Sequence, residues 1–259
     1  MHFRREGTGT PLLLIHGLSQ LHTWDPIFAD LARERDVIAV DLPGFGNSPP
    51  LPGRLTMAAL TDAVEEFIAG HGLGDVDVVG SSMGGRIALE LARRGHGGTA
   101  IALDPVGFWT DLQAKLFGAT VGGSLRLIRA MDPILPQLVR TAAGRTALLV
   151  QFSAAPWRLD PDLVLTELRS LKRSPSLDAA VHELVHGPAQ PGAPAGSLNG
   201  SVVISWGAND RVTPPSQAQR AHRLFPDASL HWFDECGHFP HWDQPDETVR
   251  LILDATRQQ

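Results

Sequence analysis

Apolar and polar positions alternate in blocks through residues 1–103. Four short apolar runs have the length and composition of buried strands: residues 11–15, 36–40, 76–79 and 99–103. Between the second and third runs, residues 57–69 carry apolar side chains at helical spacing, and Thr56 is a suitable N-cap for them. Strands that alternate with helices in this way predict a mostly parallel, doubly wound α/β sheet.

The alternation stops between Asp104 and Ser201 and then resumes. The intervening stretch has no convincing strand and contains four helix-like segments between prolines: residues 112–117, 125–131, 136–150 and 161–171. Residues 188–196, rich in proline and glycine, have the composition of a return linker. The core pattern continues with strands at 202–206 and 230–233 and helices near 215–224 and 243–256. We therefore expect a core of residues 1–106 and 197–259, with residues 107–196 as a helical insertion.

A serine lies at the centre of a G-x-S-x-G pentapeptide between a predicted strand and a predicted helix. The pentapeptide is Gly80-Ser81-Ser82-Met83-Gly84. A tight strand-to-helix turn strains its central residue and holds the Ser82 hydroxyl clear of the sheet. Glycines on either side let the strand and the helix approach closely. The context predicts that Ser82 is a nucleophile.

An acid and a base follow this serine at the ends of later predicted strands. Asp210 comes after the strand at 202–206, and His238 comes after the strand at 230–233. A serine hydroxyl needs a base within hydrogen-bond reach, and that base needs a third group to orient it. The chain order Ser82, Asp210, His238 is that of the α/β-hydrolase triad.

The developing oxyanion of an acyl-transfer reaction needs two hydrogen-bond donors. The first expected donor is the backbone N–H of Met83, directly after the nucleophile. The second is the N–H of Leu18, which follows the predicted strand 11–15 and the His16-Gly17 pair.

With these landmarks, the chain resembles the α/β-hydrolase superfamily, in its compact bacterial branch with a helical cap. The matching segments occur in family order: His16-Gly17, residues 41–48, residues 80–84, residues 207–210 and Gly237-His238. The resemblance implies an α/β-hydrolase fold, with a mostly parallel doubly wound sheet and residues 107–196 as the cap. Some members of the superfamily take the triad acid from the position of Asp104, but the turn at 207–210 favours Asp210.

Composition and charge exclude several classes of protein. The chain has 259 residues, is 43% hydrophobic and carries a net charge of −6, which argues against nucleic acid or an anionic membrane as partner. No apolar run is long enough for a membrane span, and residues 12–15 are too short for a signal-peptide core, so we expect a cytoplasmic protein. The histidines show no metal-binding spacing, and no dinucleotide fingerprint occurs, so we expect no metal and no cofactor.

The cap is expected to roof an apolar substrate pocket. Besides the triad, the residues expected to line this pocket are His16, Trp24, Phe108, Trp109 and Phe239. A carrier-protein thioester as substrate would require a basic patch near the mouth of the cap, for which Arg126, Arg129 and Arg140 are candidates. The oligomeric state cannot be predicted from the sequence.

A serine nucleophile limits the reactions that this fold could catalyse. Haloalkane dehalogenases and epoxide hydrolases of this fold resemble the chain but carry aspartate at the position of Ser82. We therefore expect a carboxylesterase that acts on a small or medium apolar ester. The alternatives are a lactonase, a thioesterase or a carbon–carbon bond hydrolase like the ring-cleavage hydrolases, whose elbow resembles residues 81–85 but whose oxyanion loop usually has more glycines. A ligand receptor on a hydrolase scaffold is the alternative that is not an enzyme.

Overall fold

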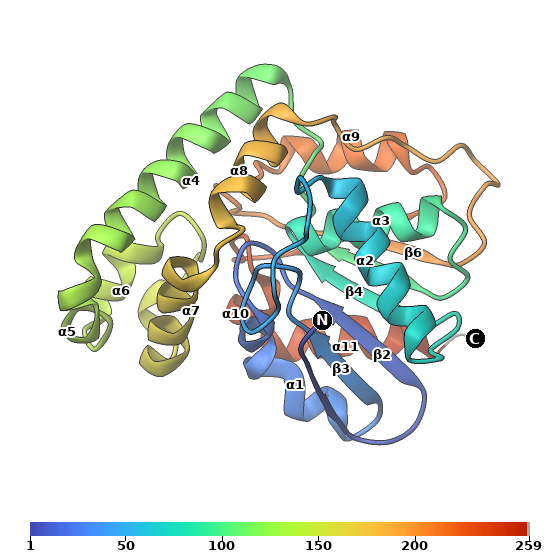
Figure 1. The fold of residues 1–259 in the computed structure, drawn as a ribbon, viewed down its shortest axis with the longest axis horizontal. Coiled ribbons are helices and arrows are strands. Elements are labelled where there is room, and N and C mark those ends of the chain that lie inside the picture. The colour runs from blue at the N-terminus through green and yellow to red at the C-terminus, as the bar shows by residue number, and fades with distance from the viewer. Residues whose placement is uncertain (258–259) are drawn as a thin grey trace.

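A computed structural model describes residues 1–257 and shows a seven-stranded sheet between two layers of helices (Figure 1). The strands are β1 (Phe3–Glu6), β2 (Pro11–Ile15), β3 (Asp36–Val40), β4 (Asp77–Ser81), β5 (Ala100–Leu103), β6 (Val202–Gly207) and β7 (Ser229–Phe233). Their order is β1-β3-β2-β4-β5-β6-β7. Strand β1 is antiparallel to β3, and all other neighbours are parallel. The expected α/β-hydrolase fold is confirmed.

The two faces of the sheet are covered by different helices. Leu12 and Leu14 pack with α1 (Asp25–Ala32) and α11 (Pro245–Thr256) on one face. Leu13 and Ile15 point to the other face, where α2 (Met57–Gly70), α3 (Met83–Arg93) and α9 (Ser216–Leu224) lie. The alternation of side chains along each strand therefore supplies both halves of the core.

The sequence pattern did not predict β1. Its four residues, Phe3–Glu6, include three charged ones and are mostly exposed. An edge strand that pairs on one side needs little apolar surface, so its hydrophobic signal is weak. The predicted helix after Thr56 is present, and the Thr56 hydroxyl accepts a hydrogen bond from the Ala59 N–H at 3.1 Å.

The segment between β5 and β6 forms a helical insertion beside the sheet (Figure 1). Its elements are α4 (Asp111–Met131), η2 (Asp132–Ile134), α5 (Leu135–Val139), α6 (Ala142–Leu149), η3 (Pro156–Arg158), α7 (Pro161–Arg173) and α8 (Leu177–His186). We call these elements the α4–α8 insertion. An apolar cluster joins α4, α5, α6 and α7 and also includes Trp242 of α10 (Pro240–Asp243).

The helices of the insertion differ from those expected. The two segments predicted at 112–117 and 125–131 form one helix, α4, because Gly118 continues the helix and allows close approach to α8. A Cβ on Gly118 would lie 2.8 Å from Cγ2 of Val185. The single helix predicted at 136–150 is broken before Thr141, which caps α6 by accepting from the Gly144 N–H at 3.0 Å. Helix α8 was not predicted.

No helix within residues 1–257 is both long and apolar enough to cross a membrane.

Candidate active site

Ser82 lies on a sharp turn between β4 and α3. Its backbone has φ 57° and ψ −113°, in a region that side chains other than glycine rarely adopt. A Cβ on Gly80 would lie 2.0 Å from the Gly84 carbonyl oxygen, and one on Gly84 would lie 2.0 Å from the Ile15 carbonyl oxygen. The two glycines are therefore required for the close approach of strands and helix that holds Ser82 in this position.

The structure brings Ser82, His238 and Asp210 together at the carboxyl ends of the parallel strands. The Ser82 Oγ lies 2.9 Å from His238 Nε2, and His238 Nδ1 lies 2.8 Å from Asp210 Oδ2. All three residues are at least nine-tenths buried. With Asp210 ionised, Nδ1–H donates to the carboxylate, so Nε2 accepts the proton of the Ser82 hydroxyl.

The Asp210 carboxylate is fixed by four donors. Its Oδ1 accepts from the backbone N–H groups of Val212 at 2.7 Å and Thr213 at 3.0 Å. Its Oδ2 accepts from the Thr213 hydroxyl at 2.5 Å in addition to His238. These bonds orient the carboxylate toward the imidazole. The role of Thr213 was not predicted, because a threonine three residues after a turn aspartate is common in loops.

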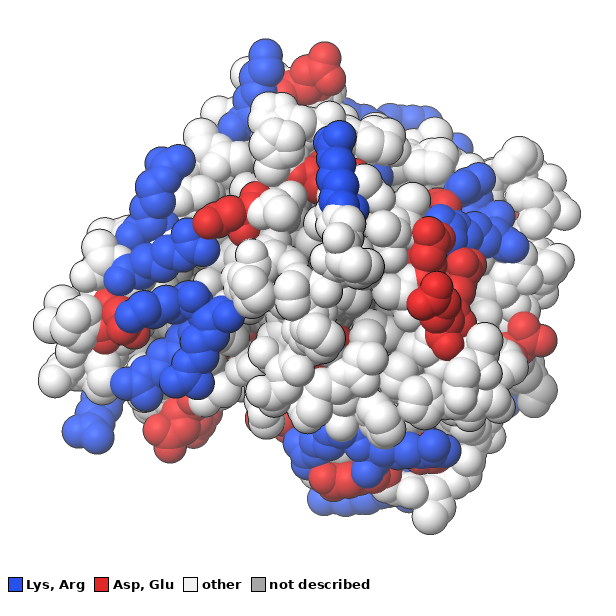
Figure 2. Space-filling model, viewed as in Figure 1, with Lys and Arg blue, Asp and Glu red and all other residues white. Residues whose placement is uncertain are grey.

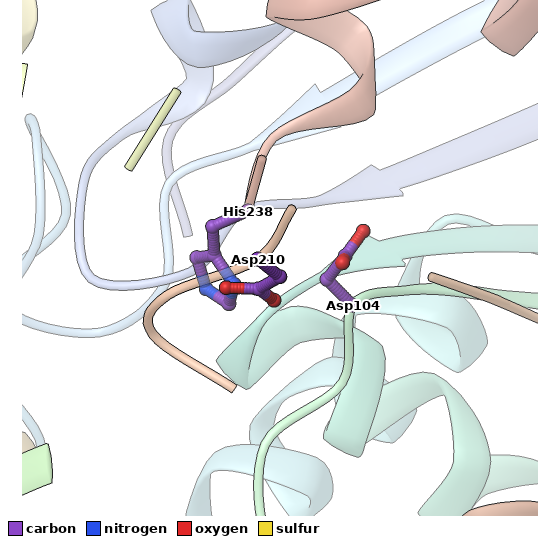
Figure 3. A group of neighbouring side chains, drawn as sticks. All are labelled: Asp104, Asp210 and His238. Atoms are coloured by element: carbon purple, nitrogen blue, oxygen red, sulfur yellow. The ribbon is translucent and has the colours of Figure 1, made fainter. Parts of the chain in front are cut away.

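A second aspartate, Asp104, lies beside Asp210 after the end of β5 (Figure 3). It is fully buried, and its Oδ1 accepts from the Gly207 N–H at 2.8 Å. Burial and the neighbouring Asp210 charge raise the pKa of Asp104 well above its usual range, which favours the protonated form of this carboxyl. His238 donates its Nδ1–H to Asp210, which supports the choice of Asp210 over Asp104 as triad acid.

Asp104, Asp210 and His238 are also close enough to be considered as ligands of a metal ion, with one ligand atom each within 4.8 Å of the others. Each Asp210 oxygen, however, already accepts two hydrogen bonds. A metal ion would have to displace these donors and the Ser82–His238 arrangement. The donor set therefore fits proton transfer better than metal binding.

The expected oxyanion donors both border Ser82. Met83 is the first residue of α3, so its N–H has no partner within the helix. Leu18 lines the same pocket as Ser82, and a Cβ on the preceding Gly17 would lie 3.0 Å from the Ser82 Cβ. The assignment of these two N–H groups as oxyanion donors stays a prediction.

The pocket above Ser82 is formed by the α4–α8 insertion and the loops at the sheet edge. Its lining residues are Leu18, Ser19, Ser82, Phe117, Val121, Leu125, Leu149, Phe152, Glu167, Leu168, Leu171, Val212, His238, Phe239 and Trp242. Most are apolar, and none is a lysine or an arginine. Figure 2 shows that basic side chains gather instead on the outer surface of the insertion.

The set of expected pocket residues needs correction. Of the five, Phe239 lines the pocket, whereas Trp109 is not among the lining residues and packs on Phe117, with ring centroids 4.8 Å apart and ring planes inclined by 33°. Phe108 is buried between Trp206 and Phe225. Apolar residues at the start of an insertion can either pack the insertion onto the core or line a pocket. The sequence does not distinguish these two roles.

His16 and Trp24 are also core residues. His16 accepts from the Leu42 N–H through Nε2 at 2.9 Å and donates through Nδ1 to the Gly17 carbonyl at 2.8 Å. Burial lowers the pKa of His16 to about 4, so its ring is neutral and braces the oxyanion loop. Trp24 is fully buried and packs on His241, with ring centroids 4.6 Å apart.

Glu167 was missed as a site residue. It lies in α7 on the face formed by Val164, Leu168 and Leu171, and it points into the pocket that contains Ser82. The sequence signal that could have identified Glu167 is a charged residue on the apolar face of an amphipathic helix.

Comparison with known proteins agrees with the fold. Residues 12–251 match the model of the alpha/beta hydrolase family, and the chain belongs to that family. A 2-hydroxy-6-oxononadienedioate/2-hydroxy-6-oxononatrienedioate hydrolase of Pseudomonas sp. is 27% identical over 92% of this chain and 82% of its own length. The chain is a hydrolase by family and by such relatives.

Two solved structures share the fold at lower identity. A thermophilic esterase from Thermogutta terrifontis superimposes with a TM-score of 0.74 at 23% identity, covering 99% of this chain and 93% of that one. The enol-lactonase from Burkholderia xenovorans LB400 superimposes with a TM-score of 0.76 at 18% identity, covering 99% and 96%. At these identities the likeness establishes the fold alone.

Proposed function

We propose that the protein is a serine carboxylesterase that cleaves a small or medium apolar ester through an acyl-enzyme on Ser82. The observation that carries this proposal is the hydrogen-bonded chain Ser82–His238–Asp210, with links of 2.9 and 2.8 Å, at the floor of an apolar pocket. In this proposal the α4–α8 insertion is the cap, residues 107–196, that closes the pocket over the core.

The proposed reaction has two halves. The Ser82 Oγ attacks the ester carbonyl while His238 Nε2 takes its proton, and the Met83 and Leu18 N–H groups stabilise the oxyanion. His238 then donates that proton to the leaving alcohol, which leaves an acyl group on Ser82. Water attacks this acyl group with His238 again as base, and the acid product leaves. Asp210 holds the imidazole in the required tautomer and stabilises the imidazolium.

A carbon–carbon bond hydrolase is the second candidate, because the Pseudomonas relative is named for dienedioate and trienedioate substrates. Such substrates carry two carboxylates by name. The pocket here has no lysine or arginine and contains the carboxyl of Glu167. Burying an unpaired carboxylate beside another carboxyl is costly, so the pocket chemistry favours an uncharged ester.

Hydrolysis of p-nitrophenyl esters from acetate to decanoate, by wild type and Ser82→Ala, tests the proposal. We expect turnover in wild type that peaks at one acyl length and is lost in Ser82→Ala, whose circular dichroism spectrum stays native. Comparable turnover in the variant would refute the serine mechanism. Lactones, acyl thioesters and a 2-hydroxy-6-oxo-dienedioate are assayed in parallel, and faster turnover of one of these would replace the ester as substrate. Rapid acylation of the protein without sustained turnover of any of these substrates would favour the ligand-receptor alternative.

A further inference from the structure

Glu167 places a carboxyl group among the apolar side chains of the pocket. The residue is 3% exposed, and neither oxygen of its side chain has a hydrogen bond of normal geometry within residues 1–257. Around it lie apolar side chains of α4 and α7, including Phe117, Val121 and Leu168. A buried polar group left in this state costs free energy of folding.

A buried glutamate that serves the fold looks different, as Glu183 shows in the neighbouring helix α8. Glu183 is buried to the same extent, at 3% exposure, but it accepts from the Met57 N–H at 3.3 Å and lies 3.9 Å from Arg54. It thereby ties α8 to the start of α2. Glu167 makes no such connection, so packing and fold do not account for its carboxyl.

The surroundings of Glu167 set its charge. Burial raises the pKa of the carboxyl to about 8, the Ser19 hydroxyl partly opposes this, and the negative charges of Asp25 and Asp41 add to it. At neutral pH the group is therefore mostly a carboxylic acid, with one O–H donor and one carbonyl acceptor. A neutral acid in an apolar pocket is suited to a neutral oxygen function.

Few other lining residues could form a hydrogen bond with a bound substrate. Besides Glu167, the polar side chains of the pocket include Ser82 and His238, which are engaged with each other, and Ser19. The Trp242 indole N–H is already bonded to the Thr23 carbonyl at 3.1 Å. A substrate bound at Ser82 therefore meets few polar side chains away from the reacting atoms, and among the lining residues Glu167 is the only carboxyl group.

We propose that Glu167 is a specificity-determining residue that binds a second, uncharged oxygen function of the substrate, such as a ketone, away from the scissile ester. This inference rests on the proposed esterase function. It narrows the substrate class from a plain alkyl ester to an ester whose acyl or alcohol part carries one further carbonyl or hydroxyl oxygen. It also explains why an otherwise apolar pocket retains a carboxyl group.

Matched ester pairs that differ by one carbonyl test this inference. In the acyl series, p-nitrophenyl 4-oxopentanoate, 5-oxohexanoate and 6-oxoheptanoate are paired with the pentanoate, hexanoate and heptanoate. In the alcohol series, butyrate esters of keto alcohols are paired with those of alkanols of equal length. The keto-to-alkyl ratio of kcat/KM is compared between wild type, Glu167→Met and Glu167→Gln, so that differences in intrinsic reactivity cancel.

For at least one pair we expect the ratio to fall about tenfold in Glu167→Met, the effect of one lost hydrogen bond. Glu167→Gln keeps an N–H donor and should retain most of the preference. Glu183→Met is the matched control and should leave the ratio unchanged. Glu167→Met should also melt at a higher temperature than wild type, because it removes an unpaired buried carboxyl, whereas Glu183→Met should melt at a lower one.

Calorimetry measures the affinity of the same esters for Ser82→Ala and for Ser82→Ala/Glu167→Met. Because neither variant turns the esters over, the difference in affinity reports the contact with Glu167 alone. Ratios that are unaffected by Glu167 in both series and in binding would overturn the inference. A fall in melting temperature in Glu167→Met as large as that in Glu183→Met would also overturn it, since the carboxyl would then serve the fold. The absence of Ser82-dependent hydrolysis of the plain alkyl esters would instead refute the proposed function.

Discussion

Replacing Asp210 or the neighbouring Asp104 by asparagine should lower activity to very different extents. In Asp210, Oδ1 accepts from two backbone N–H groups and Oδ2 faces His238 Nδ1 at 2.8 Å. An asparagine at 210 would keep its carbonyl oxygen on the backbone donors, so its NH₂ group would face Nδ1. Nδ1 must then accept a hydrogen bond, and the imidazole proton moves to Nε2, where it opposes the Ser82 hydroxyl.

The magnitude follows from this change of tautomer. A triad with the wrong tautomer and no carboxylate loses about 10⁴-fold in kcat, or roughly 5 kcal/mol of transition-state stabilisation. Burial raises the pKa of Asp104 and so favours its uncharged form, and its Oδ1 contact with the Gly207 N–H at 2.8 Å is one that an asparagine carbonyl can make. Asp104→Asn should therefore lose less than about tenfold.

The assay is the kcat/KM of p-nitrophenyl butyrate hydrolysis at pH 7.5 for both variants, with circular dichroism and thermal melts to confirm folding. A larger loss in Asp104→Asn than in Asp210→Asn, with both proteins folded, would refute the assignment of the triad acid. Equal small losses would show that neither carboxyl sets the tautomer of His238.

Glu167, Gly17 and Thr213 each test a separate part of the site. The native Glu167 keeps its proton up to about pH 8, whereas an unfolded glutamate releases it near 4.5, so wild-type stability falls as pH rises through this window, by about 3 kcal/mol at pH 7. In urea melts, Glu167→Gln should therefore be more stable than wild type at pH 8 but not at pH 4.5. An equal difference in the free energy of unfolding at both pH values would contradict this. Gly17→Ala should lower kcat/KM about 100-fold at nearly unchanged melting temperature, because the new Cβ would lie 3.0 Å from the Ser82 Cβ. Gly122→Ala, where the Cβ meets nothing within 4 Å, is the control. Thr213→Val should lower kcat about tenfold by removing the hydroxyl at 2.5 Å from Asp210 Oδ2, and Thr213→Ser should restore it; no loss in Thr213→Val would refute that role.

The core and the reacting residues were predictable because their signals are local. Continuous apolar runs mark the parallel strands, and the glycines around Ser82 mark a turn that other residues cannot make. In a parallel sheet the carboxyl ends of β4, β6 and β7 lie on one edge, so residues that follow these strands must meet. For this reason Ser82, Asp210 and His238 could be predicted from the sequence.

The insertion was less predictable because its signals are not local. Whether Gly118 breaks a helix or lets α4 approach α8 depends on Val185, far along the chain. Phe108 and Trp24 have the same side-chain character whether they line a pocket or fill the core, and only the packing decides. Glu167 showed a signal, a carboxyl on an apolar helix face, but its meaning depends on the pocket that α7 covers.

The most direct test of the central claim is to trap the acyl-enzyme. Wild type and Ser82→Ala are mixed with p-nitrophenyl butyrate, quenched in acid within the first turnover, and analysed by mass spectrometry as intact protein and as peptides. The account predicts one butyryl group in wild type, on the side chain of Ser82, and none in Ser82→Ala. A label on another residue, such as Cys236, or turnover that continues in Ser82→Ala would contradict it.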